Sequence, residues 1–345
     1  MLHLSDSINR WWRASQLRPV RFFRTVYWDN ARRPSEQRRR LAFDLARYAR
    51  NAALVPLEEL ARRRYGNDGF PVVFIVGAPR SGTTLLHQLL ATYLDVGYVS
   101  NRMARLWMTP ILAAAWDRWR EPDGHIELES EYGRGTGDAS PHEYSWFWQY
   151  YAEFERHDDL SDDEFRDIDW RPLVASLQGL AGYHRKPVVL KSINFVNYQI
   201  LGLYRLFPRA RFLWIRRAAP YVAQSILRVR EERYGSRQAW WSVRPRDVEA
   251  WRDRAPEEQV AYQIMDTLRA VGDAFEQLPR EAGQILEYER LVAEPALELQ
   301  ALAAWMGASV KLPEALRQLR LTGRNQRRVD AASWHRIEQA LGLQS

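Results

Sequence analysis

The chain of 345 residues has no cysteine, which excludes disulfide bonds, thiolate metal sites and cysteine nucleophiles. It also has no run of about 18 apolar residues, the length that a transmembrane helix requires. The first residues, Met-Leu-His-Leu-Ser-Asp-Ser, lack the apolar core of a secretory signal peptide. From these absences we expect a cytoplasmic protein, with peripheral contact at a membrane surface as an open alternative.

Lysine is scarce, because Lys186, Lys191 and Lys311 are the only lysines among 50 basic residues. A bias this strong is typical of genome composition, so clusters of arginine carry little information. The same bias makes each lysine more informative, because it tends to replace lysine wherever arginine can do the same task.

The net charge of +7 is unevenly placed. Residues 1–70 contain 15 Arg and 7 Asp or Glu, a sum of +8, so the other 275 residues sum to about −1. We predict a basic, aromatic and helical N-terminal arm over 1–69, with an amphipathic helix over 35–64. The arm interleaves cations and aromatics in Arg10-Trp11-Trp12-Arg13 and Arg21-Phe22-Phe23-Arg24.

Three interpretations of this arm stay open: a helical collar on the main domain, an interfacial membrane helix formed by residues 1–30, and a dimer arm. We do not expect nucleic-acid binding, because no known binding module accompanies the basic segment.

From residue 70 onward, short β-rich runs alternate with helical segments. This order predicts an α/β domain over 70–345, built on a P-loop-like parallel sheet with helices on both faces. The expected strands are 72–76, 96–100, 187–191, 210–216 and 284–288. The expected helices include 83–93, 197–206, 221–232 and 259–277.

Residues 101–180 interrupt this alternation, and we predict that they form a helical insertion that shapes a substrate pocket over the strand ends. The insertion is rich in tryptophan, which suits a sugar or a flat apolar group but is also typical of a core. The tryptophans considered are Trp107, Trp116, Trp119, Trp146 and Trp148.

The most informative stretch is 71–86, where an apolar strand runs through a loop of small residues directly into a helix. Gly77 and Gly82 allow tight turns, so that backbone N–H groups and the positive end of the helix face one anion. A nucleoside-triphosphatase loop carries lysine after its second glycine, but Thr83 stands there, and the cation is Arg80 inside the loop.

A second element follows the strand expected at 210–216. Arg217 stands at the strand end, and Ser225 lies eight residues further on, inside the next helix. An arginine and a hydroxyl placed in this way can hold one phosphate from two sides.

Together these two elements resemble the donor-binding motifs of bacterial sulfotransferases that use 3′-phosphoadenosine 5′-phosphosulfate (PAPS). The resemblance implies that the loop holds the 5′-phosphosulfate and that Arg217 and Ser225 hold the 3′-phosphate. It implies PAPS as co-substrate and no metal. The loop residues concerned are Arg80, Ser81, Gly82, Thr83 and Thr84.

Two further segments match the family in order and placement. Tyr288-Glu289-Arg290-Leu291 resembles the Tyr-Glu-[Asp/Glu]-Leu segment, whose tyrosine lies near the adenine. Lys191 ends the strand at 187–191 and matches the lysine that contacts the bridging oxygen of the donor.

The chain also departs from the cytosolic members. Ile193 stands where they carry the catalytic histidine, and Leu85 stands where they carry a tryptophan against the adenine. Their C-terminal phosphate clamp has no clear match, although Arg324, Arg327 and Arg328 could substitute.

The resemblance implies in-line transfer of a sulfuryl group to an acceptor hydroxyl, with Lys191 and Arg80 neutralising the leaving oxygen. Because the family histidine is missing, we look for the base in the insertion. Our choice is Glu143, whose pKa we expect desolvation to raise, with His142 as the alternative. The acceptor class stays open between a carbohydrate, a lipid-linked hydroxyl and a small aromatic molecule.

Two other classes of function stay open. A P-loop phosphotransferase is disfavoured by the missing lysine after Gly82, and a non-catalytic, membrane-associated nucleotide-binding protein would need neither Lys191 nor Glu143.

Overall fold

The computed structural model describes residues 34–66, 69–120, 126–152 and 158–343. At its centre lies a five-stranded sheet in the order β2-β5-β1-β6-β7, in which every neighbouring pair is parallel. All five predicted strands are confirmed, although the second is only two residues long. The strands are β1 (Val72–Val76), β2 (Gly97–Tyr98), β5 (Val188–Lys191), β6 (Arg211–Arg216) and β7 (Gly283–Glu287).

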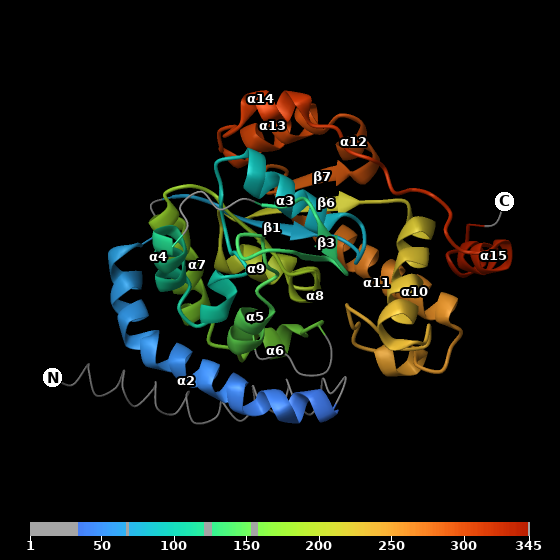
Figure 1. Cartoon of the computed structure of the whole chain (residues 1–345), viewed down its shortest axis with the longest axis horizontal. Coiled ribbons are helices and arrows are strands. Elements are labelled where there is room, and N and C mark those ends of the chain that lie inside the picture. The colour runs from blue at the N-terminus through green and yellow to red at the C-terminus, as the bar shows by residue number, and fades with distance from the viewer. Residues whose placement is uncertain (1–33, 67–68, 121–125, 153–157, 344–345) are drawn as a thin grey trace.

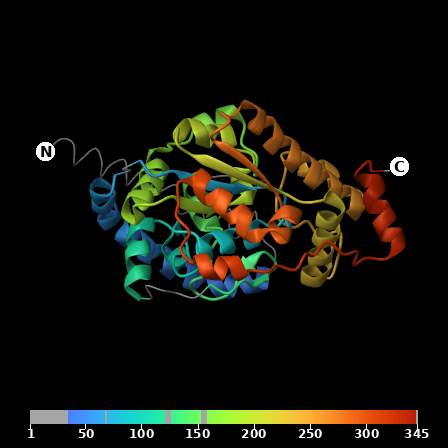
Figure 2. The same cartoon turned by 90° about the horizontal axis from the view of Figure 1, so that it is seen from above.

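Helices cover both faces of this sheet (Figures 1 and 2). Successive side chains of β1 point to opposite faces, so Phe74 belongs to one hydrophobic core and Ile75 to the other. The Phe74 side is covered by α7 (Arg171–His184), α9 (Ile200–Leu206) and α11 (Pro256–Gln277). The Ile75 side is covered by α3 (Thr83–Tyr93), α12 (Tyr288–Ala293), α13 (Pro295–Met306) and α14 (Pro313–Gln318).

The register of the sheet brings the predicted site elements to one edge. Ile75 pairs with Lys191 of β5, and Val76 pairs with Trp214 of β6. The carboxyl ends of the three central strands therefore meet beside the loop that follows β1, where ligands of parallel sheets bind.

The predicted helices 83–93, 221–232 and 259–277 are confirmed as α3, α10 (Ala219–Tyr234) and α11. The single helix predicted over 197–206 is wrong in its first residues. The chain forms the short helix α8 (Ile193–Val196), leaves it at Asn197 and begins α9 at Ile200. Asn197 is fully buried between them, and its side chain bonds the backbone of Gly77.

The helix expected over 35–64 is α2 (Pro34–Arg64), and it packs against α4 (Pro110–Arg120) and α7. Buried Glu58 accepts hydrogen bonds from the N–H groups of Ile111 and Leu112, at 3.0 Å each, and so caps α4. This part of the arm is thus joined to the main body. Residues 1–30, where we considered membrane contact or a dimer arm, lie outside the described residues.

The segment 101–180 is less uniformly helical than predicted. It contains η2 (Met103–Leu106), α4, α5 (Ser145–Ala152) and α6 (Asp162–Arg166), but also an antiparallel hairpin of β3 (Ser130–Glu131) and β4 (Arg134–Gly135). Its last helix, α7, is the crossover that covers the sheet. Further along the chain, η3 (Val248–Trp251) precedes α11, and α15 (Ala331–Ala340) packs on α10 and α11.

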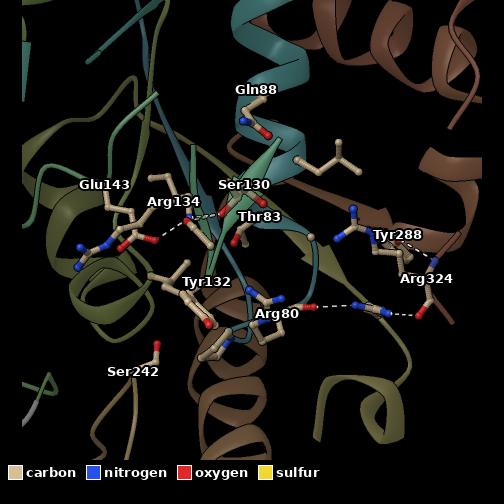
Figure 3. Close-up of a pocket in the computed structure, with 18 of the residues that line it drawn as sticks. Arg80, Thr83, Gln88, Ser130, Tyr132, Arg134, Glu143, Ser242, Tyr288 and Arg324 are labelled. Atoms are coloured by element: carbon tan, nitrogen blue, oxygen red, sulfur yellow. Dashed lines mark hydrogen bonds and ion pairs between the residues drawn. The ribbon is translucent and has the colours of Figure 1, made fainter. Parts of the chain in front are cut away.

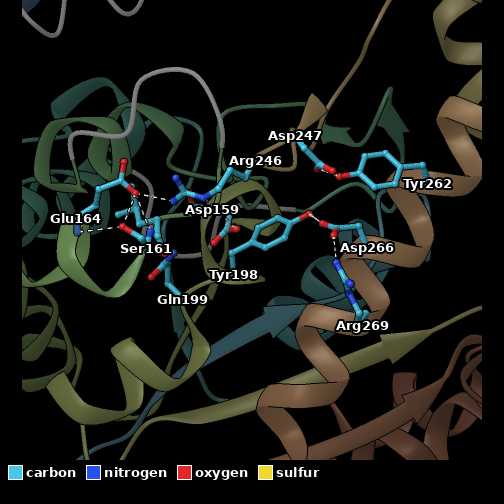
Figure 4. A network of polar contacts seen from close by, with 11 residues as sticks. Asp159, Ser161, Glu164, Tyr198, Gln199, Arg246, Asp247, Tyr262, Asp266 and Arg269 are labelled. Atoms are coloured by element: carbon cyan, nitrogen blue, oxygen red, sulfur yellow. Dashed lines mark hydrogen bonds and ion pairs between the residues drawn. The ribbon is translucent and has the colours of Figure 1, made fainter. Parts of the chain in front are cut away.

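A polar network ties segment 159–164 to the loop before η3 (Figure 4). Arg246 lies 2.6 Å from Glu164 and 3.8 Å from Asp159. On the far side of the network the hydroxyl of Tyr198 donates to Asp266 of α11 at 2.9 Å. The contacts of Arg246 thus attach segment 159–164 to the loop before η3, and the contact of Tyr198 attaches the connection between α8 and α9 to α11.

Within the part of the chain that the structure describes, we find no helix with the length and apolar character needed to cross a bilayer.

Candidate active site

The loop after β1 depends on glycine at two positions. Gly77 has φ +142° and Gly82 has φ +105°, a region that side chains disfavour. A Cβ at Gly77 would lie 2.5 Å from the carbonyl oxygen of Ile215, and one at Gly82 would lie 2.7 Å from the ring of Tyr288. Since glycine has no side chain to cap α3, the first amides of that helix stay available to an anion.

Two side chains indicate that the loop is built for a ligand. Asn197 accepts from the N–H of Gly77 and donates to its carbonyl oxygen, both at 2.9 Å, which fixes the start of the loop. The Ser81 hydroxyl is buried, and it has no hydrogen-bond partner among the described residues. A buried polar group without a partner is costly, so an anionic oxygen in the loop would satisfy it.

Arg80 joins the two predicted donor-binding elements. Its Nε donates to the Ser225 hydroxyl at 2.9 Å, and its carbonyl oxygen accepts from Nη1 of Arg217 at 3.0 Å. Burial lowers the pKa of Arg80 to about 10, and the cations of Arg217 and Arg324 add to this effect. The three positive charges close together would be stabilised by a phosphate.

Tyr288 lies in the same group, as its place in the sequence predicted. The guanidinium of Arg217 stacks over its ring at 4.6 Å from the centroid, and its hydroxyl accepts from the backbone N–H of Arg324 at 3.2 Å. Figure 3 shows Tyr288 and Arg324 on one side of the cavity, across from Glu143.

Segment 319–328, which has no regular secondary structure, closes this side of the cavity. The Gln224 side chain donates to the carbonyl of Gln326 at 2.7 Å and accepts from the N–H of Arg328 at 2.8 Å. Arg324 and Arg328 line the cavity, as expected for substitutes of the family clamp. Arg327 instead places its guanidinium over Trp334 of α15.

Lys191 forms the centre of the site and is almost fully buried, with 3% of its side chain exposed. Its ammonium group lies 2.6 Å from the Thr84 hydroxyl and 2.6 Å from a carboxylate oxygen of Glu143. The structure therefore joins the phosphate loop, the strand-end lysine and the predicted base.

The expected rise of the Glu143 pKa is wrong for this structure. Burial does act to raise the pKa, but the charge and hydrogen bond of Lys191 outweigh it, and Arg134 adds to the lowering. Glu143 is consequently held as a carboxylate.

His142 is less well placed to act as a base. Burial lowers its pKa to about 4, so the near-neutral pKa that favoured it in the sequence is not retained. Its Nδ1 accepts the backbone N–H of Tyr144 at 2.8 Å, which orients the start of α5. In the described part of the chain, His142 is not among the residues that line the cavity.

These residues surround a cavity of about 820 Å³. Of the charged side chains among its described lining residues, nine are basic and two are acidic, as expected of an anion site. They are Arg80, Arg134, Lys191, Arg217, Arg233, Arg244, Arg320, Arg324 and Arg328, against Glu143 and Asp158.

The tryptophans of the insertion divide between core and site. Trp107 is buried in the core, Trp119 is 76% exposed and Trp146 lines the cavity, while Trp148 belongs to both groups, because it is buried in the core and also borders the cavity. Trp241, from the loop after α10, lines it as well.

Strained backbone gathers at the cavity. Of the five non-glycine residues with positive φ in the described segments, Arg80, Tyr132 and Ser242 line the cavity, and Tyr144 directly follows Glu143. Such conformations cost about 1–3 kcal/mol each and concentrate at functional sites.

The site residues that were missed in the sequence include Asn197, Gln224, Gly133, Arg134 and Trp241. Asn197 and Gln224 carry no local signal, because their partners are 120 and about 100 positions away. Gly133 had a signal, the run Tyr-Gly-Arg-Gly-Thr-Gly at 132–137, which is typical of a turn.

Comparison with known proteins identifies the family to which the chain belongs. The sulfotransferase family model matches residues 71–311. The omega-hydroxy-beta-dihydromenaquinone-9 sulfotransferases Stf3 of Mycobacterium bovis and Mycobacterium tuberculosis are each 25% identical over 253 residues. These matches cover 69% of this chain and 63% of each relative, so the chain spans less than two thirds of their length.

The sulfotransferases of known structure are less similar to this chain in sequence. The structure of STF1 from Mycobacterium tuberculosis H37Rv is 16% identical, with a TM-score of 0.49 over 81% of this chain and 78% of that chain. The sulfotransferase domain from the curacin biosynthetic pathway is 14% identical, with a TM-score of 0.43 over 80% of this chain and 98% of that chain. Because both TM-scores lie below 0.5, the family rests on the match over 71–311: the chain belongs to the sulfotransferase family.

Proposed function

We propose that this sulfotransferase moves a sulfuryl group from PAPS to the hydroxyl of an acceptor. One observation carries the proposal: Lys191 contacts both Thr84 of the phosphate loop and Glu143, inside a cavity lined mostly by cations. One lysine thus contacts both the proposed phosphate-binding loop and a carboxylate. This arrangement suits transfer of a group from a phosphate oxygen to a hydroxyl.

On the donor side, the amides at the start of α3 and the Ser81 hydroxyl would hold the 5′-phosphosulfate, together with Thr83 and Thr84. Arg217 and Ser225 would hold the 3′-phosphate, and Tyr288 would border the adenine. Arg80 would serve both ends, because it belongs to the loop and its Nε already donates to the hydroxyl of Ser225.

When bound, the donor supplies an activated sulfuryl group, and negative charge grows on the phosphate oxygen that it leaves. Lys191 and Arg80 would neutralise that oxygen, and the loop amides would hold it. No metal ligand is part of this proposal.

Glu143 would accept the proton of the acceptor hydroxyl. Lys191 now holds the pKa of Glu143 down. When the ammonium group turns to the leaving oxygen, burial remains and raises the pKa of the carboxylate, which makes it a better base.

The acceptor side is lined by Trp146, Trp148 and Trp241 with Arg134 nearby, which fits a carbohydrate, a small aromatic molecule or a lipid-linked hydroxyl. The name of the Stf3 relatives, which refers to a hydroxylated menaquinone, supports the lipid-linked choice.

The test compares Glu143→Gln with His142→Asn, measuring sulfuryl turnover with labelled donor and binding of 3′,5′-bisphosphoadenosine by calorimetry. We expect Glu143→Gln to lose on the order of 10²–10⁴ in turnover while it still binds the nucleotide, because the substitution removes the base but leaves the proposed phosphate-binding residues in place. His142→Asn should keep most of its turnover.

Activity that survives in Glu143→Gln and disappears in His142→Asn would reverse the choice of base. Binding of ATP in preference to 3′,5′-bisphosphoadenosine, in the absence of magnesium, would overturn the proposed donor.

A further inference from the structure

The tip of the β3–β4 hairpin lies inside the donor side of the cavity. The carbonyl oxygen of Gly133 accepts a hydrogen bond from the Thr84 hydroxyl at 2.8 Å and another from the Lys191 ammonium group at 3.2 Å. Gly133 also approaches the guanidinium of Arg80, since a Cβ built on it would lie 3.8 Å from Nη1. One backbone oxygen therefore sits among three groups that would hold the donor.

This carbonyl oxygen occupies the place of a donor oxygen. The 5′-phosphosulfate presents oxygens that accept hydrogen bonds, and the groups meant for them are Thr84 and Lys191. A hydroxyl and an ammonium group already engaged with Gly133 cannot form the same bonds to the donor, so the two acceptors compete.

The hairpin is short, and its backbone is strained at the tip. Each strand is two residues long, and the turn residues Tyr132 and Gly133 have φ of +48° and +86°. This is the backbone of a two-residue hairpin turn, in which asparagine or glycine is favoured at the first position, so tyrosine there is strained.

The base is held on both sides. The amide of Gln88, on α3, donates to the carbonyls of Glu127 and Glu129 at 2.9 and 2.7 Å. The amide of Asn101 donates to the carbonyl of Gly135 at 3.0 Å. A displacement of the tip would thus leave the base attached to α3, the helix that follows the loop after β1.

We propose that the Tyr132–Arg134 tip fills the donor subsite of the ligand-free enzyme and that the 5′-phosphosulfate displaces it. The inference rests on the proposed function, because it needs a donor that reaches Thr84 and Lys191. The neighbours of Gly133 in the turn line the cavity too: Figure 3 shows Arg134 beside Glu143 and Tyr132 on the side of Arg80. Displacement of the tip would move both side chains, so binding of the donor would change the shape of the acceptor side.

The test places a reporter on the hairpin. Because the chain has no cysteine, Glu131→Cys, at an exposed position of β3, gives a single site for a bimane label. Glu276→Cys, at an exposed position of α11 far along the chain, is the matched control. The ligands are PAPS, 3′,5′-bisphosphoadenosine and adenosine 3′-monophosphate, and calorimetry measures their binding to each labelled protein.

We expect PAPS and 3′,5′-bisphosphoadenosine to change the emission of the label at 131 and to leave the label at 276 unchanged. Adenosine 3′-monophosphate lacks the 5′ group, so it should bind without changing either label. Nucleotides that bind without any change at 131, or a 3′-monophosphate that changes it equally, would overturn the displacement while leaving the donor assignment intact. If no adenine nucleotide binds, the proposed donor falls, and the displacement falls with it.

A second variant measures the competition itself. Replacing residues 131–134 by Asn-Gly keeps a favoured two-residue turn and withdraws the tip by one residue pair. Its reference is the double variant Glu131→Ala/Arg134→Ala, which removes the same two opposite charges but keeps Gly133. We expect the shortened hairpin to bind 3′,5′-bisphosphoadenosine about tenfold more tightly than this double variant, since two hydrogen bonds no longer compete. Equal or weaker binding would count against the proposal.

Discussion

At the level of single residues, the pKa of Glu143 depends on the cations that face it. Burial raises this pKa, while Lys191 and then Arg134 lower it, and the cations prevail in the ligand-free protein. Lys191 belongs to the donor side and is expected to leave Glu143 during the reaction. Arg134 acts on the same carboxylate in the free enzyme, and the pH profile of kcat/KM reports the pKa values of that state.

We therefore predict that Arg134→Gln moves the acidic limb of the pH profile of kcat/KM to higher pH. Removing a nearby cation disfavours the carboxylate, so its pKa rises and the base is protonated over a wider acidic range. The measurement is kcat/KM for sulfuryl transfer as a function of pH.

The matched control is Arg320→Gln, since Arg320 lines the cavity but is not among the main groups that shift the pKa of Glu143. An acidic limb that stays in place in Arg134→Gln, or moves equally in Arg320→Gln, would contradict this assignment.

At the level of elements, the donor side is assembled from three segments distant in sequence. The β6–α10 turn contributes Arg217, the β7–α12 junction contributes Tyr288, and segment 319–328 closes over them. Glu289 accepts from the amide of Asn325 at 2.6 Å, while Arg217 donates to the carbonyl of Arg324 at 2.9 Å. The closing segment has no helix or strand of its own, so side chains of α10 and α12 fix its position.

Gln224→Ala should loosen this closure and weaken nucleotide binding. Gln224 is buried, and it satisfies one carbonyl and one N–H of the segment, each worth about 0.5–1.5 kcal/mol. We expect 3′,5′-bisphosphoadenosine to bind on the order of tenfold more weakly, measured by calorimetry, with a smaller loss of thermal stability.

Gln318→Ala, at an exposed position of α14, is the control and should leave binding unchanged. Unaltered affinity in Gln224→Ala would show that the segment does not need this anchor.

At the level of the whole molecule, the buried His87 and the half-buried His142 and His184 link stability to pH. Burial lowers the pKa of His87 to about 3, and that of His142 and His184 to about 4. His87 connects α3 to β5, because its Nε2 lies 3.3 Å from the carbonyl oxygen of Val189. These side chains are neutral when folded, whereas an exposed histidine titrates near pH 6.5.

The unfolded chain thus binds more protons than the folded one below about pH 6.5, so the free energy of unfolding should fall as the pH decreases from there. We predict that His87→Gln, which keeps a hydrogen-bond donor for Val189, loses less stability than the wild type between about pH 7 and about pH 4.5. Urea unfolding across this range measures it.

His335→Gln, at an exposed position of α15, serves as the control. A wild-type stability that does not change over this range would contradict the prediction.

Local patterns were enough to predict much of the fold and several of the residues that line the cavity on the proposed donor side. Five short apolar runs separated by helical segments led to the parallel sheet, because buried strands and amphipathic helices leave signals within ten to twenty residues of chain. The loop from Gly77 to Thr84 carries its glycines, its hydroxyls and its arginine in one stretch, so it was recognisable without the fold. Lys191 was found for the same reason, since a lysine at the end of an apolar strand is a local feature.

The tertiary structure decided what depends on distant partners. The break at Asn197 arises because its side chain serves Gly77, and the low pKa of Glu143 arises because Lys191 lies 2.6 Å away. The position of Gly133 against Thr84 and Lys191 joins residues 49 and 58 positions apart. Electrostatic shifts and hydrogen bonds between segments follow distance in space, which the order of residues does not specify, and these are the features that set how the site works.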